Sequence, residues 1–271
     1  MKRYMLLSFD VEEFDMPLEY GFPISAEEQM QAGKLGLDAI EPILSDPAII
    51  ATLFTTANFA SCYPEAIAAL AKQHEIASHT YYHSAFSNEH LLQSRMKLEE
   101  ISGQQVTGLR MPRMRKVEME EVKKAGYGYD SSINPTWLPG RYNNLHLPRT
   151  MYTDDGMIRI PASVSPTFRI PLFWLSFKNI PYPIFRSLVL RTLKKDGYVC
   201  LYFHPWEFIN IANYSLPTYT RKPDGQLLLQ RLQQLIKDLK PQGEFIAMKD
   251  YVRASSRLPV TSHQPPATGS W

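Results

Sequence analysis

Short apolar runs alternate with helix-like patterns along most of the chain. The runs are four to eight residues long and rich in β-branched and aromatic residues, which is typical of buried strands. Strands that alternate with helices usually form a parallel sheet or barrel. The runs cover residues 4–9, 49–56, 75–78, 106–110, 128–131, 157–161, 198–203 and 245–248.

The expected helices are delimited by residues that usually begin or end a helix. Ser25 precedes Glu28 by three positions, which is a capping-box pattern. Pro64 stands where a first helical turn accepts proline, and Gly103 and Gly126 follow two further helical patterns. These signals predict crossover helices between the strands, and residues 226–239 add a strongly amphipathic one.

Three other segments are less regular. Residues 134–153 contain three prolines and no periodicity, so we expect a long loop over the top of the sheet. Residues 169–191 are rich in aromatic and aliphatic side chains, and we expect barrel packing with one helix there. The alternative is a patch that meets a membrane surface and a lipid-linked substrate. Residues 255–271 are expected to be a poorly ordered tail after a single domain over 1–254.

Composition excludes several classes of protein. The chain has 271 residues, 44% of them hydrophobic, and a net charge of +2 without long basic runs, so a nucleic-acid partner is not expected. No signal peptide or transmembrane segment is evident. Cys62 and Cys200 form no disulfide framework and are expected to be buried thiols. These features predict a cytoplasmic protein.

Two histidines four residues apart are the first sign of a chemical function. His79 and His83 follow a short apolar run, and imidazoles at this spacing can bind one divalent metal ion. Histidines at this spacing also occur by chance on surfaces and in cores. The acidic cluster Asp10, Glu12 and Glu13 at the end of the first strand favours the metal site.

Ionisable side chains recur at the ends of the expected strands. The carboxyl ends of parallel strands meet at one face of a barrel, where active sites of this architecture lie. We therefore expect one site at that face. The residues at or just past strand ends are Asp10, His79, Arg110, Asp130 and His204.

Several motifs together carry a family resemblance. Residues 51–83 contain a strand, a proline-initiated helix and the pattern H-E-I-A-S-H-x-x-x-H, followed by R-M-P at 110–112, Y-D-S-S at 129–132 and L-x-x-H at 201–204. With these motifs the chain resembles the polysaccharide deacetylase (NodB-homology) family, the carbohydrate esterase family four type. The similarity covers residues 4–251.

The resemblance implies a distorted (β/α) barrel with seven or eight mostly parallel strands that acts as one catalytic domain. It also implies metal-dependent hydrolysis of an N-acetyl group on a sugar, with one divalent ion, zinc foremost and Co, Ni, Mn or Fe as alternatives. The implied roles are metal ligands for His79 and His83, general base for Asp10, orientation of that base for Arg110, general acid for His204 and tuning of that acid for Asp130.

The chain departs from the family in its first motif. The family usually has two adjacent aspartates there, but Val11 follows Asp10. Side chains two apart on a strand share a face, so we expect Glu12 to be the third metal ligand and Glu13 to point away. The pattern D-V-E resembles a subset of the family that includes enzymes of cyclic amides and of exopolysaccharide synthesis.

The expected substrate-binding residues are Trp206, Trp137, Pro112 and Leu201. The two tryptophans could pack on a sugar face or belong to the core. The leading hypothesis is a deacetylase of an N-acetylated sugar or glycan precursor in polysaccharide or cell-surface glycan synthesis. The alternatives are a hydrolase of a cyclic imide or ureide and a metal-free carbohydrate-binding pseudoenzyme.

Overall fold

The computed structural model describes residues 2–255. Apart from Ser255, the tail expected over 255–271 lies outside the described residues. Nine strands form one sheet with the order β10-β1-β2-β3-β4-β5-β9-β8, and β11 pairs with the first two residues of β1, Tyr4 and Met5. These strands are β1 Tyr4–Val11, β2 Thr52–Thr55, β3 Glu75–Ser78, β4 Gly108–Leu109, β5 Tyr129–Asp130, β8 Tyr152–Asp154, β9 Met157–Arg159, β10 Tyr198–Phe203 and β11 Glu244–Phe245.

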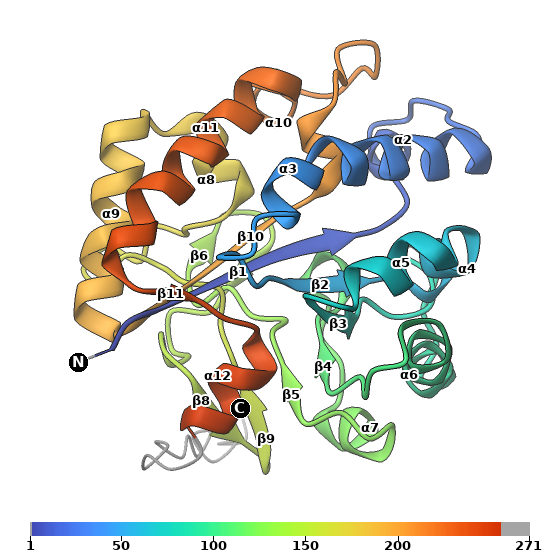
Figure 1. The fold of residues 1–271 in the computed structure, drawn as a ribbon, viewed down its shortest axis with the longest axis horizontal. Helices are drawn as coiled ribbons and strands as arrows, with labels where there is room; N and C mark the ends of the chain where they lie inside the picture. The colour runs from blue at the N-terminus through green and yellow to red at the C-terminus, as the bar shows by residue number, and fades with distance from the viewer. Residues whose placement is uncertain (1, 256–271) are drawn as a thin grey trace.

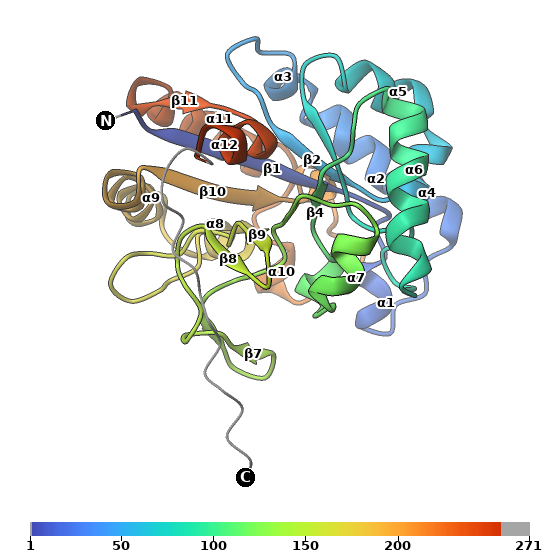
Figure 2. The ribbon, with the colours of Figure 1, turned by 90° about the horizontal axis from the view of Figure 1, so that it is seen from below.

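Helices surround this sheet (Figures 1 and 2). The longer ones connect parallel strands, as the sequence pattern predicts. The α-helices are α1 Met16–Glu19, α2 Ala26–Ala39, α3 Glu41–Leu44, α4 Ala57–Cys62, α5 Pro64–Leu70, α6 Glu89–Ser102, α7 Met119–Lys124, α8 Trp174–Asn179, α9 Tyr182–Asp196, α10 Thr218–Arg221, α11 Gly225–Leu239 and α12 Met248–Ser255. Three 3₁₀ turns are η1 Pro112–Met114, η2 Pro205–Phe208 and η3 Lys240–Gln242.

The sheet is parallel except for one pair, β8 and β9. Its curvature brings the segment after β9 back to β10, where the Ser163 N–H donates to the Cys200 carbonyl at 2.9 Å. Among residues 2–255 no strand ladder joins β9 to β10, and the two sides of the sheet meet there through loop contacts. The mixed α/β fold with a mostly parallel sheet confirms the expected class, with nine strands rather than seven or eight.

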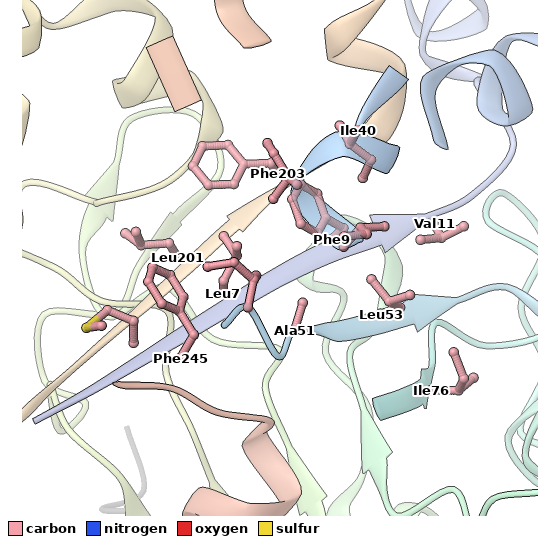
Figure 3. Close-up of a cluster of buried hydrophobic side chains, with 14 of the residues drawn as sticks. Leu7, Phe9, Val11, Ile40, Ala51, Leu53, Ile76, Leu201, Phe203 and Phe245 are labelled. Carbon is pink, nitrogen blue, oxygen red and sulfur yellow. The ribbon is translucent and has the colours of Figure 1, made fainter. Parts of the chain in front are cut away.

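The central strand β1 separates two cores. Leu7, Phe9 and Val11 point to the helices and pack with residues of β2, β3 and β10 (Figure 3). Leu6 points to the interior, where it packs with Phe54. Each fully buried side chain of this size contributes about 1.5–3 kcal/mol to stability. Because Leu6 faces inward, Ser8, Asp10 and Glu12 follow on the same face of the chain.

Some expectations were wrong in detail. The loop expected over 134–153 contains a small hairpin of β6 Trp137–Leu138 and β7 Tyr142–Asn143, and β8 begins at its end. Residues 169–191 form two helices, α8 and most of α9, rather than one. Cys62 is exposed, whereas Cys200 is buried as expected. No helix within residues 2–255 is long and apolar enough to span a membrane.

A buried carboxyl group connects the last helix to the sheet. Glu75, 1% exposed, accepts hydrogen bonds from the Thr52 hydroxyl at 2.8 Å, the Tyr129 hydroxyl at 2.9 Å and the backbone N–H of Lys249 at 3.0 Å. Lys249 lies in the first turn of α12, so Glu75 supplies an acceptor for that turn. Burial raises the pKa of Glu75, although these hydrogen bonds oppose the shift.

We expect Glu75→Gln to make the protein's stability less dependent on pH. The raised pKa means that the folded state holds the proton of Glu75 more tightly, so the contribution of Glu75 to the free energy of unfolding falls as the pH rises above the unfolded pKa. That loss is at most about 1.4 kcal/mol per pH unit. Urea denaturation near pH 5 and pH 7.5 measures the difference between the proteins. An equal effect of the exposed control Glu65→Gln would contradict the assignment to Glu75.

Candidate metal centre and active site

A buried ion pair joins the first strand to the fourth. Arg110, directly after β4, donates from Nη1 to Asp10 Oδ1 at 2.6 Å and to Ser8 Oγ at 3.0 Å. Its other nitrogens donate to the backbone and hydroxyl oxygens of Ser131. Arg110 is 0% exposed and Asp10 3% exposed. Burial lowers the pKa of Arg110, but the charge and hydrogen bond of Asp10, together with other neighbouring groups, raise it overall, so the guanidinium stays charged.

Glu12, His79 and His83 form a cluster beside this pair. Glu12 Oε2 lies 3.0 Å from His79 Nε2 and 3.2 Å from His83 Nε2. All three side chains are buried, and their potential ligand atoms lie within 4.8 Å of one another. The other oxygen of Glu12 accepts a hydrogen bond from Trp206 Nε1 at 3.1 Å. Glu12 therefore has one oxygen fixed and one directed at the two imidazoles.

The Nδ1 atoms of both imidazoles are hydrogen-bonded on the side of the ring away from Glu12. His79 Nδ1 lies 2.7 Å from the Arg110 carbonyl oxygen, and His83 Nδ1 lies 2.7 Å from Asp15 Oδ1. Both partners are acceptors only, so each Nδ1 carries the hydrogen. In the neutral rings both Nε2 atoms then present lone pairs toward Glu12. Metal-binding histidines are commonly oriented by such contacts.

Three acceptor atoms that face one another need a cation or a proton between them. Glu12 Oε2 is buried without a hydrogen-bond donor when the imidazoles are neutral. Burial lowers the pKa of His83, but Glu12 and Asp15 outweigh this effect and raise it to about 9. A tetrahedral zinc ion holds its ligand atoms about 3.3 Å apart, close to the separations between Glu12 and each histidine. The donor set and spacing therefore fit a divalent metal ion.

A left-handed residue brings the two histidines together. Thr80, the residue after His79, has a φ of 62°, which is uncommon for a β-branched residue. Its N–H is bonded to Ser78 Oγ, and its hydroxyl donates to the Tyr82 carbonyl. These bonds hold a tight turn that returns the chain, so His83 lies 5.7 Å from His79 between ring centroids. Strained residues of this kind concentrate at functional sites.

Asp15 links His83 to the rim of the site. It accepts from His83 Nδ1 and from the Ser84 hydroxyl, and Arg113 Nη2 lies 3.3 Å from both of its oxygens. Burial raises the pKa of Asp15, but the hydrogen bond and charge of His83 oppose this effect. The net result is a pKa below the usual value of an aspartate. Asp15 is thus an anionic partner that fixes the orientation of His83.

We expect Asp15→Asn to weaken zinc binding about 10- to 100-fold, because the variant loses the charge that orients His83 and raises its basicity. Competition with a chromophoric chelator measures the affinity. Glu19→Gln is the matched control, since Glu19 also pairs with Arg113, whereas His83 Nδ1 is bonded to Asp15. Equal losses in both variants would show that Arg113 placement, not the Asp15 contact, controls affinity.

His204 follows β10 at the same end of the sheet. Its Nε2 lies 3.9 Å from Asp10 Oδ2, and its Nδ1 lies 3.1 Å from Glu207 Oε1. The ring stacks on Trp206 at 4.9 Å and meets Trp174 edge-on at 5.2 Å. Burial lowers the pKa of His204, but the hydrogen bond with Glu207 and the nearby carboxylates raise it above its usual value.

The carboxylate that contacts His204 Nδ1 is Glu207, whereas the resemblance implies that Asp130 tunes this histidine. Asp130 is fully buried, but it accepts hydrogen bonds from Arg159 Nε at 2.9 Å and from the N–H and hydroxyl of Ser132. His204 Nδ1 lies beside Glu207, three residues later. Asp130 thus holds the loop after β5, and Glu207 holds the imidazole.

A cavity of about 270 Å³ opens above these groups. It is near the lower end of small-molecule sites, and its lining joins a polar floor to apolar walls. The polar floor consists of Asp10, Glu12, His79, His83 and His204, and the apolar walls include Met16, Met111, Phe173 and Trp174. The strand ends therefore converge as expected from the sequence.

The four expected substrate-binding residues lie outside the lining of this cavity. Trp206 is 1% exposed and holds Glu12, whereas Trp137 is 61% exposed on the hairpin. Leu201 belongs to the core on the helix side of the sheet. Pro112 is buried at the start of η1, between two residues that line the cavity.

Two residues of the site were not predicted. Asp15 is the last acid of D-V-E-E-F-D, and Glu207 ends H-P-W-E. Both acids lie within a few residues of predicted site residues, and that proximity was the available signal. Their roles depend on short turns after β1 and β10, and strand periodicity carries no information about such turns.

The fold and site define a class of (β/α) proteins with a carboxylate–histidine–histidine cluster and an adjacent Asp–Arg–His group. Residues 36–129 match the family model described as polysaccharide deacetylase. Over these residues the chain is similar to that family, in agreement with the resemblance noted in the sequence. A search of curated proteins found no match.

Solved structures of similar fold cover nearly the whole chain. A protein from Mycobacterium smegmatis assigned as a polysaccharide deacetylase has 19% identity and a TM-score of 0.65, over 98% of this chain and 95% of that chain. A protein from Pseudomonas aeruginosa PAO1 with the same assignment has 16% identity and a TM-score of 0.64, over 94% of this chain and 91% of that chain. Puue allantoinase has 17% identity and a TM-score of 0.60, over 95% of this chain and 92% of that chain. The family match and fold support a deacetylase or a related hydrolase.

Proposed function

We propose that the chain is a metal-dependent hydrolase that removes an N-acetyl group from a sugar or glycan precursor. One divalent ion, zinc foremost, would be held by Glu12, His79 and His83. The observation that carries this proposal is the convergence of three buried acceptor atoms, with both imidazoles oriented from behind. When bound, such an ion supplies Lewis acidity and lowers the pKa of water.

The other residues are placed for proton transfer. Asp10 uses Oδ1 to bind Arg110, and its Oδ2 faces His204, so this carboxylate can take a proton from the attacking water. Arg110 orients Asp10. His204, with its raised pKa, can hold a proton at Nε2 and give it to the departing amine nitrogen. Amide hydrolysis needs both transfers, and both groups line the same cavity.

The shape of the site supports a sugar that is part of a larger molecule. A second depression of about 860 Å³ shares Arg113, Met114, Arg141 and Tyr142 with the cavity. A single sugar unit in the cavity could therefore continue along this depression. A cytoplasmic precursor in glycan synthesis is the substrate that the sequence favours. The second candidate is ring opening of a cyclic ureide, because the cavity volume of about 270 Å³ also suits a small molecule.

The test combines metal content with two assays. Protein purified without a metal-affinity tag is given zinc and measured by elemental mass spectrometry, with His79→Gln as the variant and the exposed His146→Gln as the control. We expect one zinc per chain in the wild type and control, loss in His79→Gln, and acetate release from N-acetylglucosamine oligosaccharides. Ring opening of allantoin without acetate release would favour the second candidate, and sugar binding without zinc would indicate a pseudoenzyme.

A further inference from the structure

Glu207 contacts His204 twice through one oxygen. It lies in η2, the turn directly after β10, and is 0% exposed. Oε1 accepts the backbone N–H of His204 at 2.8 Å and lies 3.1 Å from its Nδ1. A carboxylate in this position fixes both the backbone and the ring of the same residue.

Lys178 supplies the charge opposite the other oxygen of Glu207. Its Nζ lies 3.4 Å from Glu207 Oε2, which has no hydrogen-bond donor, and both side chains are fully buried. Lys178 also donates to the Thr220 carbonyl at 2.9 Å. A buried carboxylate without a partner is strongly unfavourable, so the ammonium allows Glu207 to stay beside His204 as an anion. Lys178 is in α8 and Thr220 in α10, so three elements meet behind the imidazole.

The environment of His204 leaves one orientation of the ring. An anionic carboxylate only accepts, so Nδ1 carries a hydrogen toward Glu207. Nε2 then points to the cavity, 3.9 Å from Asp10 Oδ2. Trp206 and Trp174 pack against the ring, and Tyr202 lies edge-on at 6.1 Å.

We propose that Glu207, with Lys178 as its buried counter-charge, is the positioning residue that fixes His204 with Nδ1 protonated and Nε2 directed into the cavity. The family resemblance implies that Asp130 is the carboxylate that tunes His204. The orientation of His204 is inferred from the contacts described above. Only the catalytic consequence of that orientation rests on the proposed function.

Nuclear magnetic resonance of the imidazole nitrogens tests the proposal without an assay. Long-range ¹H–¹⁵N spectra of protein labelled at its seven histidines report the tautomer, and His204→Gln identifies the signal. The spectra are taken with and without zinc, at a pH where His204 is neutral. We expect the Nδ1–H tautomer in the wild type. An Nε2–H tautomer in the wild type would overturn the proposal before any variant is made.

Two paired substitutions separate geometry from charge. Glu207→Gln with Lys178→Met keeps an oxygen acceptor for Nδ1 and avoids a buried unpaired charge, so the Nδ1–H tautomer should persist. Glu207→Leu with Lys178→Met removes the acceptor, and the tautomer should be lost. Unchanged spectra in the Leu variant would contradict the proposal, as would a loss of the tautomer in Asp130→Asn, the comparison variant. If the Leu variant does not fold, the wild-type spectrum and Asp130→Asn still decide.

The kinetic consequence is measured separately. With an N-acetylated oligosaccharide, we expect the Leu variant to lower kcat by roughly 100-fold or more while KM changes little, because a general acid is misplaced but the cavity walls are intact. A rise in KM with unchanged kcat would assign Glu207 to substrate binding and overturn the positioning role. Absence of acetate release in the wild type, with the expected tautomer present, would refute the proposed function and leave the assignment of Glu207 intact.

Discussion

Glu12→Gln is expected to abolish stable zinc binding and turnover together. The substitution preserves the size of the side chain but removes the negative charge between the two imidazoles. The loss of affinity should exceed the about 100-fold cost of losing a hydrogen-bond partner of a ligand. Isothermal titration with zinc and an acetate-release assay measure the two losses.

Glu13→Gln is the matched control for this prediction. Glu13 is the next residue and is also buried, but it turns away and bonds to the Thr56 hydroxyl and to Asn58 Nδ2. The control should cost about 1 kcal/mol of stability and leave zinc binding intact. A loss of zinc in Glu13→Gln but not in Glu12→Gln would show that the alternation of β1 does not extend to its end.

Asp10→Asn is expected to separate metal binding from catalysis. The variant should bind zinc like the wild type, because Asp10 is not part of the acceptor cluster. Turnover should fall by about 100- to 10,000-fold, since an amide oxygen is too weak a base to take a proton from water. Zinc content and kcat are measured on the same preparation.

Ser8→Ala is the control that distinguishes loss of the base Asp10 from loss of another hydrogen bond to Arg110. Ser8 Oγ accepts from Arg110 Nη1 as Asp10 does, but it lies farther from the cavity along β1 and is not part of its lining. We expect less than about a tenfold change in kcat for this control, because Asp10 and Arg110 remain paired. If Asp10→Asn keeps turnover within the same range, another group is the base.

Much of the fold follows from periodicity in the sequence. The strands over residues 75–78 and 198–203 have the predicted bounds, and Ser25 accepts from the Glu28 N–H as the capping pattern indicates. Apolar runs of this length bury both faces, which makes them easy to recognise. The short strands β6, β7 and β8 were missed, because two or three residues show no period.

The site could be predicted to the level of strands but not of turns. Alternation along β1 predicted that Glu12 would share a face with Asp10, and the structure places both in the cavity lining. The resemblance pointed to Asp130 as the partner of His204, but the turn after β10 brings Glu207 there instead. A three-residue turn depends on backbone angles and packing that a single sequence does not reveal.

The alternation of β1 also limits how this site can change during evolution. Phe9 and Val11 fill the core on one face, while Asp10 and Glu12 face the cavity on the other. An inserted or deleted residue in the strand would exchange the two sets, burying carboxylates in the hydrocarbon core and pointing phenylalanine at the histidines. Selection for a stable fold would therefore eliminate such changes of strand register, even in a lineage that no longer needs the catalytic activity. The spacing of Asp10 and Glu12 can therefore be retained after the catalytic activity has been lost.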